Sequence, residues 1–386
     1  MFLRGHSAHA HGKSFLMALA PSFMPVSALV FSLSFISMKV KVACLSLSLL
    51  LVCIYLISSK DRRIFSIYPR QLVLALLLLL VFLKDVFLFF LGEVQLYYLF
   101  YTLSNLLVFF VFCLIVNHNN VAFLKKYLVV SVVISVMLLI IYIGTGVSVV
   151  VGNIPAFTII FTFIYFAEFE KFNHLFFFLC AATALIVGIV LTARTAIAML
   201  LIYLLLCAFK VVSGVSKVSM AFLLVLTLIG SSLAVGTFFS QSTNLIEQLS
   251  HRPIIWNYYL QEINDAPFFG HGRINLNVAN EVGASVNSVI GRGRSYSAHN
   301  FYINVLYENG FVLGLLLLIY IFIACVHLRN KYSIFVVLML IMGVAEPIYI
   351  GGFSPYDNVL TLVLAVALGK TESFPAWRSS PAATSF

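Results

Sequence analysis

The stretch SAHNFYINVLYENG (297–310) begins with a polar pair, His299 and Asn300, and leads directly into a long apolar run. A histidine titrates near neutral pH, so its neutral form can accept a proton from a hydroxyl group. We therefore treat His299 as a candidate general base. The alternative is a histidine that marks the boundary of a helix and has no part in chemistry.

Glu308 follows in the same run, nine positions after His299. Nine residues of regular helix cover about 14 Å, and at about 100° per residue they turn the side chain to the opposite face. We therefore expect no direct contact between Glu308 and His299. Glu308 is expected to bond to a neighbouring helix.

Two arginines also lie beside apolar runs. Arg194, in LTARTAIAML (191–200), separates two such runs and has no acid near it in the sequence, which is costly unless the charge is paired or solvated. Arg252 precedes the first turn of a short predicted helix in HRPIIWNYYLQEINDAPFFGHG (251–272). An arginine at a helix start can combine with free backbone N–H groups to hold an anion. The alternative for both is a side chain that reaches the lipid headgroups.

The elements that must position these residues are membrane helices. The chain has 386 residues, of which 62% are hydrophobic and only 9% charged, and its mean hydropathy is +1.08. A soluble domain has about 25% charged residues, so a bilayer is the expected solvent. No run alternates as a barrel strand does. We predict an all-α, polytopic integral membrane protein with about twelve helices, at 14–37, 41–58, 70–91, 96–117, 124–143, 154–167, 174–192, 195–209, 218–239, 301–325, 333–350 and 356–369.

The distribution of Lys and Arg predicts the orientation. Most of the 23 basic residues fall in the segments that alternate crossings assign to the cytoplasm when both termini are inside. The net charge of +10 comes from basic residues in the short gaps between apolar runs. Nucleic-acid binding would need a basic patch on a polar surface, so this distribution argues against it. The one large polar segment, 240–300, is then external, with a short helix at the interface. Arg194, Arg252 and His299 meet at the same outer surface.

The three motif stretches resemble the signatures of the O-antigen ligase and O-antigen polymerase superfamily of bacterial membrane glycosyltransferases. The likeness covers about 190–315, the motif-bearing catalytic region, within a single transmembrane domain of residues 1–386. The family's helix motif is His-Asn, nine residues and Gly, often with a second Gly three positions on. Gly310 fits this pattern, whereas Gly314 comes one place late. Thr192-Ala193-Arg194 stands where the family commonly has T-x-S-R.

The resemblance implies an inverting, metal-independent glycosyltransferase that acts on an undecaprenyl-diphosphate-linked glycan and needs no cofactor. Arg194 and Arg252 would bind the diphosphate and His299 would be the catalytic base. Asn300, Tyr302 and Glu308 would support the site, with Glu308 in the cavity wall. The location would be the bacterial inner membrane, with the active site facing the periplasm. The partners would be the membrane, the lipid-linked oligosaccharide and a possible chain-length regulator.

We expect a polymerase that joins lipid-linked repeat units, because the motifs depart from the ligase pattern. An O-antigen ligase, which transfers the glycan to lipid A core, is the alternative and would need the same residues. A flippase or another transporter would need cations inside its spans. Lys84, beside Asp85, is the one basic residue deep in a predicted span. The two could form a half-buried site, but adjacent helical positions point about 100° apart and each side chain can find a separate partner.

Overall fold

The computed structural model describes residues 67–119, 122–145, 154–169, 174–190, 193–213, 223–232, 252–272, 298–328, 332–346, 350 and 355–369. Within these residues the regular secondary structure is helical, as predicted. A further short apolar helix covers Leu223–Ser232. The labelled helices are α3 (Pro69–Phe90), α4 (Leu96–Asn119), α5 (Ala122–Thr145), α6 (Ile154–Phe169), α7 (His174–Val190), α8 (Arg194–Ser213), α11 (Arg252–Asp265), α13 (Phe301–Leu328), α14 (Ser333–Gly343) and α15 (Pro355–Leu368).

Three of the described helices are long and apolar enough to cross a membrane, judged by length and composition. Six shorter apolar helices accompany them. The predicted runs 14–37 and 41–58 lie outside the described residues. The total of about twelve spans and the external position of segment 240–300 stay predictions. The three long spans are Pro69–Phe90, Tyr98–Asn117 and Phe301–Ile323.

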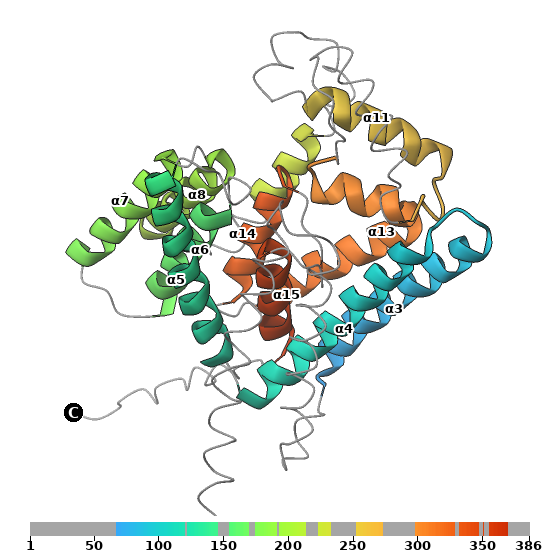
Figure 1. The fold of residues 1–386 in the computed structure, drawn as a ribbon, viewed down its shortest axis with the longest axis horizontal. Helices are drawn as coiled ribbons and strands as arrows, with labels where there is room; N and C mark the ends of the chain where they lie inside the picture. The colour runs from blue at the N-terminus through green and yellow to red at the C-terminus, as the bar shows by residue number, and fades with distance from the viewer. Residues whose placement is uncertain are drawn as a thin grey trace, which may run out of the picture.

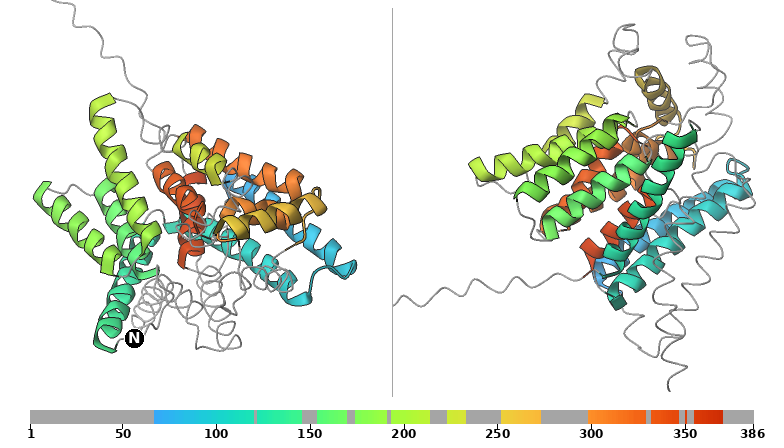
Figure 2. Two further views of the ribbon diagram at one scale, coloured as in Figure 1. Left: turned by 90° about the horizontal axis from the view of Figure 1, so that it is seen from above. Right: turned by 60° about the vertical axis from the view of Figure 1, so that its left-hand side comes forward.

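The helices form two groups on either side of a central pair (Figure 1). Helices α5 to α8 pack together on one side, and α3 packs against α4 on the other. Between them stand α14 and α15, which contact α8 and α4 respectively. Helix α11 lies along α13, as the view from above also shows (Figure 2). Of the motif-bearing helices, α8 and α13 therefore contact α14, and α11 packs on α13.

Helix α13 is broken at Gly310, whose φ is 68° and ψ is 179°. A side chain rarely adopts this conformation, and a Cβ at Gly310 would lie 2.3 Å from the carbonyl oxygen of Phe268. The break separates a half-helix, Phe301–Asn309, from the rest of α13. The predicted run 301–325 matches the extent of the helix, but the sequence did not predict this break.

The chain that follows α11 closes the break with its own backbone. Gly270, with φ of +67°, lets this chain approach closely, because a Cβ there would lie 2.5 Å from the backbone of Gly310. The carbonyl groups that the break frees therefore gain new donors. Three hydrogen bonds join the two segments: Phe311 N–H donates to the Pro267 carbonyl (2.7 Å), His271 N–H to the Tyr307 carbonyl (2.9 Å) and Gly272 N–H to the Glu308 carbonyl (3.0 Å).

Candidate active site

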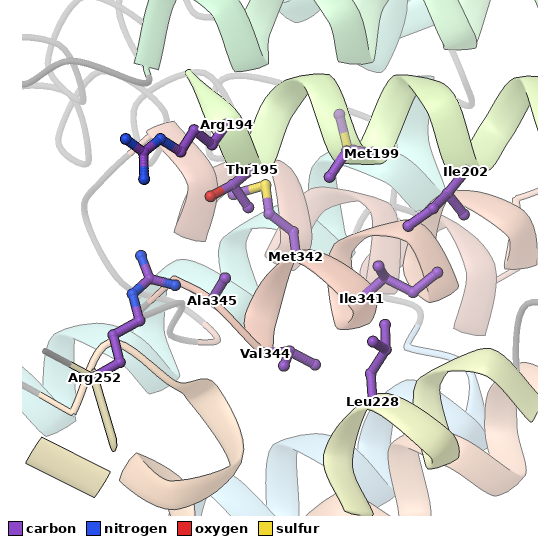
Figure 3. A pocket seen from close by; sticks show the side chains of 11 residues that line it. Arg194, Thr195, Met199, Ile202, Leu228, Arg252, Ile341, Met342, Val344 and Ala345 are labelled. Atoms are coloured by element: carbon purple, nitrogen blue, oxygen red, sulfur yellow. The ribbon is translucent and has the colours of Figure 1, made fainter. Parts of the chain in front are cut away.

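Arg194 and Arg252 line the same pocket, although they lie 58 positions apart in the sequence. The cavity has a volume of about 330 Å³. In Figure 3 both guanidinium groups lie at one end of it, and the apolar side chains of Met199, Ile202 and Leu228 line the other. The pocket is therefore amphipathic, with a cationic end and an apolar end. The tertiary structure thus brings together the two arginines that the sequence singled out.

Each of these arginines is the first residue of a helix. Arg194 begins α8 and Arg252 begins α11, and neither helix has an acidic residue in its first turn. A helix N-terminus carries partial positive charge and normally favours an anion nearby. Two cations at two such ends therefore make a strongly positive site. This arrangement is unfavourable for an empty pocket and favourable for one that holds an anion.

Glu346 supplies a carboxylate beside the arginines. It follows α14, is buried, and accepts a hydrogen bond from Thr195 Oγ1 at 3.0 Å. Burial lowers the pKa of Arg252 below its ordinary value of 12.5; the charge of Glu346 raises it and that of Arg194 lowers it. Two guanidinium groups against one carboxylate leave a net positive charge. The charge of Glu346 acts on Arg252, so this carboxylate is a counter-ion to that arginine.

His299 comes two residues before the start of α13 and is not among the residues that line this pocket, but it lies near enough to Arg252 for that charge to act on it. Its φ is 46°, a left-handed conformation that is uncommon outside glycine. Burial lowers the pKa of His299 to about 4, and the positive charge of Arg252 acts in the same direction. The imidazole is therefore neutral near pH 7, as a proton acceptor must be. The strained backbone is of the kind that clusters at functional sites.

Trp256 fixes His299 relative to Arg252, and sequence analysis did not assign it this role. Its indole N–H donates to the carbonyl oxygen of Ala298 at 2.8 Å. Trp256 lies four positions after Arg252, so the two side chains share one face of α11. Farther along, Tyr259 packs edge-on against Tyr307 of α13, with ring centroids 4.9 Å apart. The aromatic face of α11 thus packs on the protein, and the interfacial position of this helix stays a prediction.

Asn300 and Tyr302 connect the start of α13 to the pocket walls. Asn300 is the helix cap, since its Oδ1 accepts the N–H groups of Tyr302 (3.0 Å) and Ile303 (3.1 Å). Its Nδ2 also donates to Ser232 Oγ at 3.3 Å, in the helical segment that supplies Leu228 to the pocket. Tyr302 Oη donates to the Leu340 carbonyl at 2.7 Å, just before the lining residues Ile341 and Met342.

Glu308 lies at the other end of the half-helix, and it is not among the residues that line this pocket. Its carbonyl oxygen accepts hydrogen bonds from Lys84 Nζ and from the backbone of Gly272. Lys84 and Asp85 form a buried ion pair of 2.9 Å, which is the half-buried site that the sequence left open, although adjacent helical positions point apart. The reason is the length of the lysine side chain, which can curl around the helix to its neighbour.

These features together describe a helical protein with membrane-length apolar spans and a cationic pocket beside a neutral histidine. Residues 177–319 match the model of a protein family described as O-Antigen ligase. This match supports the O-antigen ligase and polymerase superfamily, and the resemblance inferred from the three motifs is confirmed. Members of this family are glycosyltransferase-like enzymes. Arg194, Arg252 and His299 all lie in the matched segment. A comparison with curated proteins finds no match.

Proposed function

We propose that this protein is an O-antigen type polysaccharide polymerase, which joins undecaprenyl-diphosphate-linked repeat units at the periplasmic face of the inner membrane. The observation that carries the proposal is the pocket of Arg194 and Arg252, which has a cationic end and an apolar end. A polyprenyl diphosphate has the complementary shape, with a doubly charged head and a hydrocarbon tail. The family match over 177–319 supports a lipid-linked sugar as the substrate.

The chemistry requires a leaving group, a base and an acceptor. The acceptor hydroxyl attacks the anomeric carbon of the donor sugar from the face opposite the diphosphate, so the configuration inverts. The new C–O bond forms as the bond to the diphosphate breaks, and the bonding electrons leave with the diphosphate. Arg194 and Arg252 bind that developing charge with guanidinium forks. His299 takes the hydroxyl proton, for which its neutral form is suited.

The proposed reaction needs no divalent metal, because two arginines and two helix N-termini supply the positive charge that a metal would otherwise bring. In the described part of the chain, no group of three or more His, Cys, Asp or Glu side chains is placed to hold a metal ion. A chain-length regulator is a further proposed partner. The catalytic region of 190–315 lies within a single membrane domain in this proposal.

The second candidate function is O-antigen ligase, which would use the same pocket and base but transfer the glycan to lipid A core. The description of the matched family names this activity. The polymerase is preferred because Thr192-Ala193-Arg194 and the position of Gly314 depart from the ligase pattern. Both functions place the diphosphate on the arginines and differ only in the acceptor.

The surface glycan of a strain that lacks this protein separates the functions. A single repeat unit on lipid A core is expected if the protein is the polymerase. Bare core together with accumulated lipid-linked polymer would instead identify the ligase. Lipid-linked single units held in the cytoplasmic leaflet would indicate a flippase and would overturn both enzymatic proposals. Complementation with the unchanged gene should restore the full ladder of chain lengths.

A further inference from the structure

A buried ion pair in α3 contacts the broken helix, about 14 Å along the half-helix from His299 at 1.5 Å per residue. Lys84 and Asp85 are only 9% and 1% exposed, and their charged atoms lie 2.9 Å apart. Asp85 Oδ2 also accepts a hydrogen bond from Thr102 Oγ1 of α4 at 2.6 Å. A charge at this depth in an apolar span is costly, so its retention indicates a function.

The Lys84 ammonium lies at the C-terminal end of the half-helix Phe301–Asn309. It donates to the carbonyl oxygen of Glu308 and approaches Asn309 Oδ1 at 3.4 Å. The break at Gly310 leaves the last carbonyl groups of the half-helix without their usual partners, and these groups carry partial negative charge. A cation there satisfies a carbonyl group and opposes the helix dipole at the same time.

Asp85 and Thr102 hold the ammonium in this position. Asp85 balances the charge of Lys84, and the hydroxyl of Thr102 fixes the carboxylate from the adjacent helix. Gly272 completes the cluster, because it donates its N–H to the Glu308 carbonyl, and a Cβ on it would lie 2.5 Å from Val94 Cγ2 and 3.6 Å from Asp85 Oδ1. The four contributions come from α3, α4, α13 and the segment after α11. They meet at the one place where α13 departs from helical geometry.

We propose that Lys84 is a positioning residue, which caps the half-helix Phe301–Asn309 and thereby holds His299 in register with the arginine pocket. Asp85 and Thr102 orient the Lys84 side chain toward the end of the half-helix. This inference rests on the proposed function for its kinetic consequence. Its structural consequence is that the half-helix becomes less ordered when the cap is removed, and this holds whatever the enzyme transfers.

The test replaces the whole pair in the full-length protein in lipid nanodiscs. The double variant Lys84→Met with Asp85→Leu removes both charges, and replacing a buried ion pair by apolar residues is often neutral for stability. A single change would leave one buried charge unpaired and confuse stability with positioning. Lys84→Arg keeps a cation at the helix end. The matched control is Gln71→Leu with Asn117→Leu, which removes another polar pair between α3 and α4, in which Gln71 is buried and Asn117 half-buried, with hydrogen bonds of 2.8 and 3.1 Å.

Two measurements are made on every variant. Hydrogen exchange reports the backbone N–H groups of the half-helix and of segment 266–272. Steady-state kinetics with purified undecaprenyl-diphosphate-linked repeat units report kcat and KM. The double variant should have normal thermal stability, faster exchange in both segments, a nearly unchanged KM and a kcat lower by roughly 10²-fold, the loss expected from a misplaced catalytic group. Lys84→Arg should recover part of kcat, and the control pair should leave both readouts unchanged.

A double variant with normal exchange and normal kcat would overturn the proposal, because the pair would then be only a packing feature. Equal losses in the control pair would also overturn it. If the double variant does not fold, Thr102→Val provides the test, with smaller changes expected in the same two readouts and none if the proposal is wrong. If the unchanged protein transfers no sugar, the proposed function fails, while the exchange data still decide whether Lys84 caps the half-helix.

Discussion

Substitution of Arg252 tests the diphosphate site, because two different changes separate its geometry from its charge. Arg252→Lys keeps the positive charge but replaces a planar fork by a point charge. Arg252→Gln removes the charge. If Arg252 binds the leaving diphosphate, the lysine variant loses a charge-assisted contact that strengthens in the transition state. Such a contact is worth about 10²–10³ in rate.

The structure makes the effect larger at Arg252 than at Arg194. Arg252 is half-buried, so solvent screens its charge less, whereas Arg194 is exposed. The glutamine variant should show a second effect. The charge of Arg252 helps to lower the pKa of His299 to about 4, so its removal should raise that pKa. Protonated histidine cannot accept a proton, so activity is lost as the pH falls through this pKa.

The assay is transfer from purified lipid-linked repeat units, with kcat/KM measured from pH 3.5 to 8. The acid limb of the unchanged enzyme is expected near pH 4, that of Arg252→Lys at the same place, and that of Arg252→Gln at higher pH. Arg292→Lys, in the Gly-rich segment outside the described residues, is the control and should be nearly silent. The reasoning is refuted if Arg252→Lys behaves like this control, or if the acid limb does not move in Arg252→Gln.

Three further predictions follow from the same structure. His299→Ala should lower the transfer rate by about 10²–10⁴ at a normal protein level in the membrane, and chains of normal length on a gel would reject its role as base. Gly310→Ala should lower the midpoint of thermal unfolding and the protein level, because positive φ and a Cβ 2.3 Å from a carbonyl oxygen are both unfavourable; an unchanged midpoint would show that the break is not required. In a Cys-free background, a cysteine at Ser285 should react with a membrane-impermeant thiol reagent from the periplasm and one at Ser216 should not, and reversed labelling would place the pocket on the wrong side.

The apolar runs could be predicted from the sequence because hydropathy is a local property. The run 70–91 corresponds to α3 at Pro69–Phe90, and the short helix predicted within 251–272 is α11, Arg252–Asp265. Charged residues that interrupt apolar runs were also informative. Arg194 and Arg252, which lie beside apolar runs, were singled out in this way, and both line the pocket.

The contacts between distant segments could not be predicted in the same way. Gly270, Gly272 and Gly310 are visible in the sequence, but nothing local shows that the first two fill a break made by the third. The hydrogen bond from Trp256 to Ala298 joins residues 42 positions apart. Such pairings follow from the packing of α11 on α13, which depends on shape complementarity that a hydropathy pattern does not contain.

The most direct test of the central claim is reconstitution. The purified protein is placed in liposomes with undecaprenyl-diphosphate-linked repeat units and EDTA, and both the glycan length and the released undecaprenyl diphosphate are measured. If the proposed function is right, we expect glycans of two or more units, one released diphosphate lipid for each bond formed, and no product from His299→Ala. An unchanged protein that forms no glycosidic bond to another lipid-linked unit or to lipid A core, or that forms one only when divalent metal is restored, would contradict it.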